Sequence, residues 1–108
     1  MENQTTSYPK EKVNILLLEN ISEAAARHFT QGGYASVKRI SGALSEEQLL
    51  KEISNVHLLG IRSKTLITPR VLDAARKLQA IGCFCIGVNQ VDLKSARQRG
   101  VVVFNAPY

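Results

Sequence analysis

The stretch Val56-His57-Leu58-Leu59-Gly60-Ile61, followed at once by Arg62-Ser63-Lys64-Thr65, decides the fold. A short apolar run of this kind is typical of a strand that is covered on both faces. Two cations and two hydroxyl side chains follow where the apolar run ends. In open sheets of alternating strands and helices, ligands bind at the carboxyl ends of the strands. The stretch therefore predicts a central strand that carries a candidate anion site at its end.

Further apolar runs and helical patterns alternate on both sides of this strand. The runs predict four more strands, at 13–18, 37–40, 80–86 and 101–104. Each intervening helix begins at a residue type that caps helices, namely Ser22, Ser45 (with Gln48 as a capping box), Thr68 (before Pro69) and Asp92. Alternation with short connections predicts an α/β fold, a flavodoxin-like doubly wound parallel five-stranded sheet in the order 2-1-3-4-5.

The helical patterns also predict which side chains face the core. In the first helix we expect Ala24, Ala25, His28 and Phe29 to point inward, and in the third helix Val71, Leu72, Ala75 and Leu78. The run at 37–40 is flanked by cations, so this strand is expected at an edge of the sheet.

Length and charge limit the function classes. A chain of 108 residues allows one small domain, in which we expect residues 1–12 to form a flexible leader. The net charge of +5 invites a nucleic-acid partner, but the cations are dispersed among acids, so we expect no nucleic-acid binding. No long apolar span or signal-like segment occurs, which predicts a soluble, cytoplasmic protein with no membrane partner.

The sequence carries no motif for metal, nucleotide or covalent chemistry. Cys83 and Cys85 are predicted on one face of one strand, too close in sequence for a disulfide, and are interpreted as buried free thiols. His28 and His57 lie in other elements, so we expect no metal site. None of the seven glycines forms a G-x-G-x-x-G loop, and no nucleophile has an adjacent base, so we expect no catalytic residue in this chain.

The predicted strand order places the ends of two strands together. Arg62, Ser63 and Lys64 would then face the loop Gly87-Val88-Asn89, a set that suits a small carboxylate or phosphate. From the residues alone, solvated cations at a strand end are an equally good interpretation. A phosphate-accepting receiver domain is disfavoured, because it needs an aspartate at the end of the third strand, which reads Gly60-Ile61-Arg62 here.

Several stretches together resemble a known family. They are Asn14-Ile15-Leu16-Leu17-Leu18-Glu19, Gly60 to Thr65, Ile81 to Leu93 with both cysteines, and Val103-Phe104-Asn105-Ala106-Pro107-Tyr108. From about residue 13 to the end, the sequence resembles the D-3-phosphoglycerate dehydrogenases, which are D-isomer-specific 2-hydroxyacid dehydrogenases.

The resemblance implies an NAD-dependent oxidation of D-3-phosphoglycerate to 3-phosphohydroxypyruvate in L-serine biosynthesis, by a homo-oligomeric parent enzyme. Residues 13–108 would be the N-terminal segment of its substrate-binding domain, with the NAD-binding Rossmann domain, the ACT domain and a later helix of the substrate domain all outside this sequence. We therefore expect the 108 residues alone to be inactive, and part of their sheet to be uncovered.

The resemblance also assigns roles by position. Arg62 and Ser63 match substrate-anion contacts, and Lys64 stands where many bacterial members have a second arginine. Val88 and Asn89 match a loop that holds the substrate carboxylate, and Ile86 matches a position that can approach the nicotinamide. Ser41 stands where some bacterial members have a lysine, which leaves a contribution from that position in doubt. The alternative function is a free-standing small-anion binding or regulatory module on the same fold.

Overall fold

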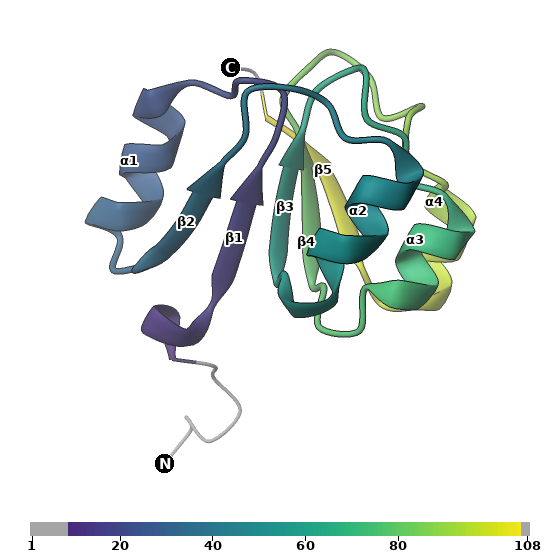
Figure 1. Ribbon diagram of the computed structural model, residues 1–108, viewed down its shortest axis with the longest axis horizontal. Coiled ribbons are helices and arrows are strands. Elements are labelled where there is room, and N and C mark those ends of the chain that lie inside the picture. The colour runs from purple at the N-terminus through teal and green to yellow at the C-terminus, as the bar shows by residue number, and fades with distance from the viewer. Residues whose placement is uncertain (1–8, 107–108) are drawn as a thin grey trace.

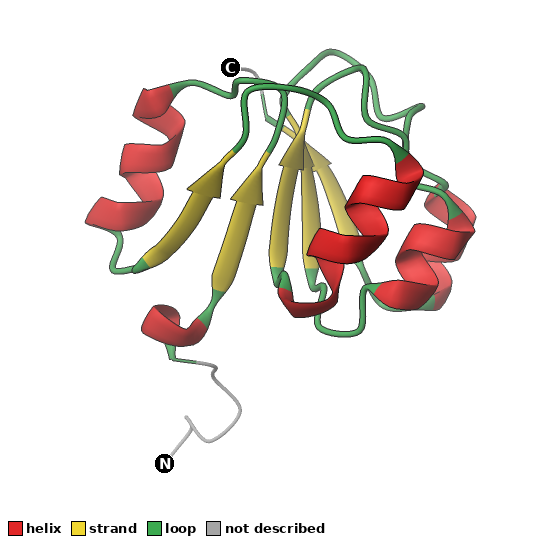
Figure 2. Cartoon of the chain, viewed as in Figure 1, coloured by secondary structure: helices red, strands yellow, loops and turns green. Residues whose placement is uncertain are grey.

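The computed structural model describes residues 9–106, which form a parallel sheet with helices on both faces (Figures 1 and 2). The strand order is β2-β1-β3-β4-β5, as the sequence predicts. The strands are β1 (Asn14–Leu17), β2 (Ser36–Arg39), β3 (Leu58–Ile61), β4 (Ala80–Cys83) and β5 (Val102–Asn105). The helices are η2 (Lys10–Lys12), α1 (Glu23–Gln31), α2 (Glu46–Glu52), η3 (Ile53–Asn55), α3 (Pro69–Ala74) and α4 (Leu93–Gln98). No helix within residues 9–106 is long and apolar enough to cross a membrane.

The strand β3 lies at the centre of the sheet, as predicted from its apolar sequence. It pairs in parallel with β1, where Leu59 is opposite Leu16, and with β4, where Ile61 is opposite Cys83. All strands point the same way, so the carboxyl ends of β1, β3 and β4 meet at one edge (Figure 1). This arrangement brings the residues after Ile61 next to those after Leu17 and Cys83.

The predicted helix caps are confirmed. The hydroxyl of Ser22 accepts from Ala25 N, that of Thr68 from Val71 N, and the Asp92 carboxylate from Ser95 N. Ser45 and Gln48 form the complete capping box at the start of α2. Local hydrogen-bonding chemistry thus determines where each helix begins.

The predicted inward residues of the third helix are all buried, while one residue of the first helix is placed wrongly. In α1, Ala24 is exposed and Ala26 is buried beside Ala25. His28 is exposed, but it lines the open hollow over the sheet and so faces the sheet as predicted. Helix α3 ends at Ala74, and Ala75 has left the helical conformation with a ψ of 69°. Leu78 is nevertheless buried, since the turn that follows α3 folds it back onto the core.

The predicted leader falls mostly outside the described residues. Its last part, Lys10–Lys12, is a 3₁₀ helix rather than an irregular segment. The Lys10 ammonium donates to Gly32 O at 2.9 Å and lies 5.6 Å from the centre of the Tyr34 ring. These contacts join the start of the described chain to the C-terminal end of α1.

The two faces of the sheet are covered unequally. Helices α2, α3 and α4 pack on one face around alternate strand residues such as Leu59, Ile61 and Ile81, and this side holds the larger core cluster. Helix α1 packs on the other face, over Ile15 and Leu17. Figure 1 shows α1 apart from the group of α2, α3 and α4.

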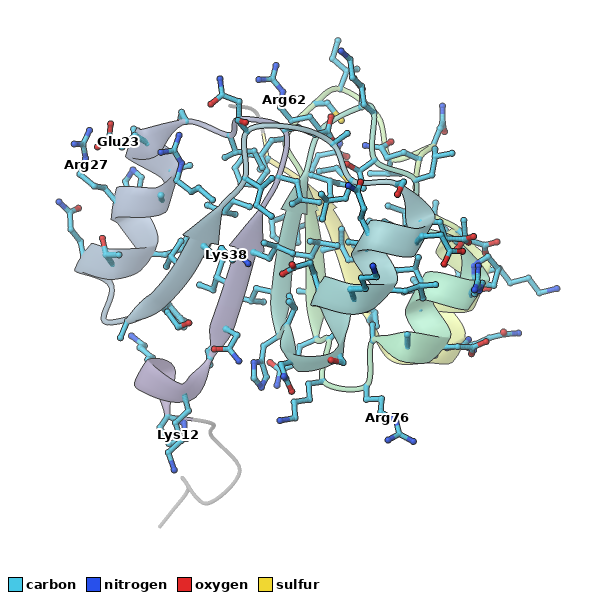
Figure 3. All side chains as sticks on the ribbon, in the orientation of Figure 1. Lys12, Glu23, Arg27, Lys38, Arg62 and Arg76 are labelled. Carbon is cyan, nitrogen blue, oxygen red and sulfur yellow. The ribbon has the colours of Figure 1, made fainter. Side chains whose placement is uncertain are left out.

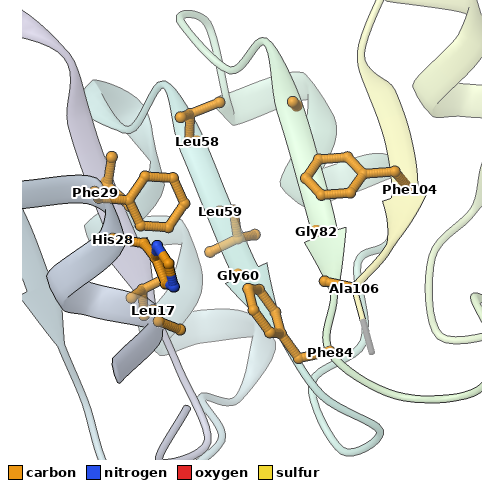
Figure 4. Close-up of a pocket in the computed structure, with 13 residues that line it drawn as sticks. Leu17, His28, Phe29, Leu58, Leu59, Gly60, Gly82, Phe84, Phe104 and Ala106 are labelled. Atoms are coloured by element: carbon orange, nitrogen blue, oxygen red, sulfur yellow. The ribbon is translucent and has the colours of Figure 1, made fainter. Parts of the chain in front are cut away.

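Beyond α1, that second face is open, as the sequence predicts. A hollow of about 220 Å³ runs over β3, β4 and β5 and is lined almost wholly by apolar side chains (Figure 4). Small residues form much of its floor: Gly60, Ala80, Gly82 and Ala106. The rings of Phe84 and Phe104 lie over the glycines, so the sheet partly fills the space with its own aromatic side chains.

Candidate functional site

A hollow of about 1020 Å³ lies at the carboxyl ends of β3 and β4. Four of the sequence-predicted site residues line it together: Arg62, Ser63, Ile86 and Asn89. Leu66, Phe84, Cys85, Gly87, Gln90 and Asn105 complete the wall. The volume is ample for a small metabolite. The predicted meeting of the two strand-end loops is therefore confirmed for Arg62, Ser63, Gly87 and Asn89.

Lys64 lies on the other side of the same loop, contrary to the prediction that it faces residues 87–89. It lines a separate hollow of about 370 Å³ with Glu19, Asn20, Ser41, Gly42 and Ala43, and Arg62 and Ser63 border both hollows. Further along the same loop, the Thr65 side chain is fully buried. Ser41, whose role the sequence left in doubt, is thus a neighbour of Lys64.

The remaining predicted residues differ in exposure. Val88 lines neither hollow; it packs against the larger core cluster, and its carbonyl oxygen accepts from Val91 N at 3.1 Å. Ile86 is fully exposed, at 102%. Val88 therefore supports the loop, while Asn89 and Ile86 are the members that a ligand can reach.

The cationic side chains of the site are open to solvent. Arg62 and Lys64 are exposed, and within residues 9–106 neither side chain forms an ion pair. Figure 3 places Arg62 at the carboxyl end of the sheet and Arg76 at the opposite end. Exposed cations that form no ion pair and lie beside amide side chains suit a small anion.

The backbone of the same loop, in contrast, is already occupied by a carboxylate. Glu19 Oε2 accepts from Arg62 N at 2.8 Å and from Thr65 N at 3.1 Å, and Oε1 accepts from Lys64 N at 2.9 Å. Partial burial raises the pKa of Glu19, but these backbone donors, together with the Thr65 side chain, outweigh it and leave the pKa below the ordinary value. The carboxylate is therefore ionised at neutral pH.

Two amide side chains fix the loop that follows β4. The Gln90 amide donates to Arg62 O at 2.7 Å and to Cys85 Sγ at 3.1 Å, which ties the β3 and β4 loops together. The Asn105 amide donates to Cys85 O at 3.1 Å and to Ile86 O at 3.2 Å. The wall of the larger hollow is thus held by one side chain from the loop after β4 and one from the end of β5.

These three supporting residues were not predicted as part of the site. Glu19 lies just after β1, Asn105 ends β5, and Gln90 follows the predicted Gly87-Val88-Asn89 loop. Position at a strand end was the available signal for Glu19 and Asn105. Their targets are backbone groups, which have no residue-specific signature in a sequence.

The two cysteines differ from the prediction of two buried thiols on one strand. Strand β4 ends at Cys83, so Cys85 belongs to the loop, is half-buried and lines the larger hollow. Strand pairing gives way there to side-chain hydrogen bonds, because the Asn105 amide donates to the carbonyl oxygens of residues 85–87. Burial, with smaller effects from Cys85 and Glu19, raises the pKa of Cys83 to about 11.

No group of three or more metal-ligating side chains occurs in the described part of the chain.

Comparison with known proteins gives a consistent result. The family model for the catalytic domain of D-isomer specific 2-hydroxyacid dehydrogenases matches residues 15–108. The D-3-phosphoglycerate dehydrogenase of Dictyostelium discoideum is 53% identical over 104 residues, which is 96% of this chain and 25% of that protein. The enzyme of the same name from Escherichia coli K12 is 47% identical over 102 residues, 94% of this chain and 25% of that protein. The chain thus spans about a quarter of these relatives.

Solved structures share the fold. The TT0316 protein from Thermus thermophilus has a TM-score of 0.78 and 28% identity, covering 88% of this chain and 30% of that one. The NAD⁺-bound 3-phosphoglycerate dehydrogenase of Entamoeba histolytica has a TM-score of 0.73 and 18% identity, covering 88% of this chain and 33% of that one. The latter likeness concerns the fold.

Proposed function

We propose, from the premise that the chain belongs to the D-isomer specific 2-hydroxyacid dehydrogenase family, that it is part of an NAD-dependent D-3-phosphoglycerate dehydrogenase. In this proposal residues 13–108 are the N-terminal segment of the substrate-binding domain. Two relatives of that name, at 53% and 47% identity, support the assignment. Placement of the parent in L-serine biosynthesis, in the cytoplasm and in a homo-oligomer rests on the resemblance alone.

The observation that carries the proposal is the pair of exposed cations on either side of Ser63, at the carboxyl end of β3. D-3-Phosphoglycerate has a carboxylate at one end and a phosphate at the other. Arg62 and Ser63 would contact one anionic group together with Asn89, and Lys64 would add charge from the neighbouring hollow. Val88 would act through the loop backbone.

The residues of this chain do not fit the phosphate groups of NAD, because its seven glycines form no G-x-G-x-x-G loop. The proposed cofactor contact is limited to Ile86, whose exposed side chain can meet a nicotinamide ring that other residues hold. The 108 residues alone should therefore not reduce NAD with D-3-phosphoglycerate. Turnover above background in an absorbance assay of the purified chain would contradict this.

Substrate binding is tested with two arginine variants of equal charge change. Arg62→Ala removes the cation of the site, and Arg76→Ala removes an exposed cation at the opposite end of the sheet (Figure 3). Titration with D-3-phosphoglycerate, followed by calorimetry, should show at least about tenfold weaker binding for Arg62→Ala, since charge-assisted hydrogen bonds are lost. Equal losses in both variants would mean unspecific attraction to a basic chain, and the proposal would fail.

A further inference from the structure

The Glu19 carboxylate accepts hydrogen bonds from three backbone N–H groups of the candidate anion loop. The distances of 2.8, 2.9 and 3.1 Å, from Arg62 N, Lys64 N and Thr65 N, are those of charge-assisted hydrogen bonds. A run of converging N–H groups is ordinarily itself an anion-binding nest. Here an acid of the same chain fills it.

The loop contains two kinds of anion-binding group, backbone N–H groups and cationic side chains, and Glu19 binds the N–H groups of residues 62, 64 and 65. With the N–H groups bound to Glu19, an incoming anion is left with the side chains of Arg62 and Lys64 on either side of Ser63. The carbonyl oxygen of Arg62 is fixed from the opposite side by Gln90, at 2.7 Å. The loop backbone is therefore held from β1 and from the β4 loop at once.

The backbone at Glu19 and at the next residue is in an unfavourable conformation. Glu19 and Asn20 both have left-handed backbones, with φ of 61° and 57°. Such a conformation is unfavourable for a residue with a side chain such as Glu19, and asparagine tolerates it better. It is kept in place by backbone hydrogen bonds to the β2–α2 connection, from Glu19 N to Gly42 O at 3.0 Å and from Asn20 N to Ile40 O at 3.2 Å. Strain of this kind is concentrated at functional sites.

We propose that Glu19 is a positioning residue, whose carboxylate fixes the Arg62–Thr65 backbone so that the two cationic side chains are presented to the substrate anion from opposite sides of the loop. The proposal rests on the proposed function of this loop. It assigns Glu19 no contact with substrate: its carboxylate acts through the backbone of residues 62, 64 and 65.

Three charged or titratable groups lie near this carboxylate, namely Arg62 and Lys64 of the β3 loop and Cys83 of β4. Arg39 of β2 binds the backbone of the same segment, where it donates to the carbonyl oxygen of Ile21. The lowered pKa of Glu19 means that its hydrogen bonds to the loop are complete at neutral pH. They are lost when the pH falls through that lowered pKa, below the ordinary 4.5.

The test compares Glu19→Gln with Glu23→Gln. Both remove one negative charge, but Glu23 is exposed on α1 and its ion pair with Arg27 is long, at 3.9 Å. Amide hydrogen exchange should accelerate by about tenfold or more at Arg62, Lys64 and Thr65 in Glu19→Gln alone, since a neutral amide is a weaker acceptor. Affinity for D-3-phosphoglycerate, measured well below the melting temperature, should fall by about tenfold in Glu19→Gln and remain unchanged in Glu23→Gln.

The possible results separate the two proposals. If amide exchange at residues 62, 64 and 65 is unchanged in Glu19→Gln, Glu19 does not hold the loop. If exchange is faster but the affinity for D-3-phosphoglycerate is unchanged, Glu19 holds the loop without positioning the cations for binding. Absence of any phosphoglycerate binding by the unaltered chain contradicts the proposed function, while the exchange data still decide whether Glu19 holds the loop. If Glu19→Gln does not fold, the unaltered chain is titrated by NMR. The three amide protons should then move together with one apparent pKa below 4.5, and independent movement overturns the proposal.

Discussion

The side-chain amide of Gln90 donates to the carbonyl oxygen of Arg62 at 2.7 Å, across the gap between the β4 and β3 loops. The same nitrogen lies 3.1 Å from Cys85 Sγ, so one amide binds both the β3 loop and another residue of its own β4 loop. The relative placement of Arg62 and Asn89 therefore depends on a residue whose side chain is itself half-buried in the wall.

Removing this amide should loosen the site. We expect Gln90→Ala to lower the free energy of unfolding by at most about 1 kcal/mol, the net value of one hydrogen bond, and to weaken phosphoglycerate binding several-fold. Gln79→Ala is the matched control, because the Gln79 side chain is exposed at the other end of the sheet. Urea denaturation and calorimetric titration of both variants give the comparison. Equal effects would mean that the Gln90 bond does not matter to the site.

Substitution by alanine should affect stability differently at Gly60 of β3 and at Gly87 of the β4 loop. A Cβ at Gly60 would lie 2.6 Å from Leu17 Cδ2 and 3.1 Å from Phe84 Cε1, inside the smaller core cluster. Gly60→Ala should therefore lower the free energy of unfolding by about 1–3 kcal/mol, the usual range for overpacking. Gly87→Ala meets no atom within 4 Å and should be neutral in the same urea titration. A neutral Gly60→Ala would show that Leu17 repacks without cost.

His57 should make stability depend on pH. Its Nδ1 accepts from Asn14 N at 3.0 Å, and burial, with a smaller effect of Lys77, lowers its pKa. A lowered histidine pKa means that the unfolded chain binds the proton more readily, so this contribution is complete above about pH 6.5 and decreases as the pH falls below it. In His57→Asn an amide oxygen can take the place of Nδ1. Denaturation curves from about pH 5 to 8 should show a smaller pH slope for this variant, and identical slopes would contradict the assignment.

The two thiols should react at different rates. Cys83 is buried, and burial raises its pKa to about 11, so little thiolate is accessible at neutral pH. Cys85 is half-buried and lines the larger hollow. Brief treatment of the native chain with N-ethylmaleimide should modify Cys85 first, with Cys83 modified only after denaturation. Peptide mapping by mass spectrometry identifies the site, and prior labelling of Cys83 would contradict the structure.

The open apolar face should promote association of the chain. Val102 and Phe104 are 61% and 47% exposed on the same face of β5, beside the apolar hollow. Val102→Lys should reduce association in sedimentation experiments over a range of concentrations, because it adds a charge to this face. Leu66→Lys alters a residue that is 62% exposed but lies at the candidate site, and should have no such effect. A concentration-independent mass of one chain would refute the expectation.

Much of the fold was predictable because it depends on local chemistry. The capping box at Ser45, the proline after Thr68 and the apolar run before Arg62 indicate where elements begin and end, and their alternation gives the parallel order. The end of β4 was placed too late, since the apolar residues continue to Ile86 while the strand pairing stops at Cys83. There the side-chain amide of Asn105, and not the backbone of a neighbouring strand, donates to the carbonyl oxygen of Cys85.

The site was predictable only in part, for a related reason. The predicted strand order correctly placed Arg62, Ser63 and Asn89 at one hollow, because it brings their two loops together. The direction of Lys64 and the hydrogen bonds of Glu19 depend on the path of the backbone after Ser63. That path goes with the burial of Thr65 and with contacts between distant segments, which periodicity and composition do not reveal.

The left-handed pair at Glu19 and Asn20 has a consequence for protein engineering. A common route to thermal stability replaces non-glycine residues of positive φ with glycine, which adopts this conformation freely. At position 19 such a redesign would ease the backbone and at the same time delete the acceptor of three hydrogen bonds. The Asn20 side chain accepts none of these three hydrogen bonds. Asn20→Gly can therefore be tried without removing the bonds that hold the anion loop.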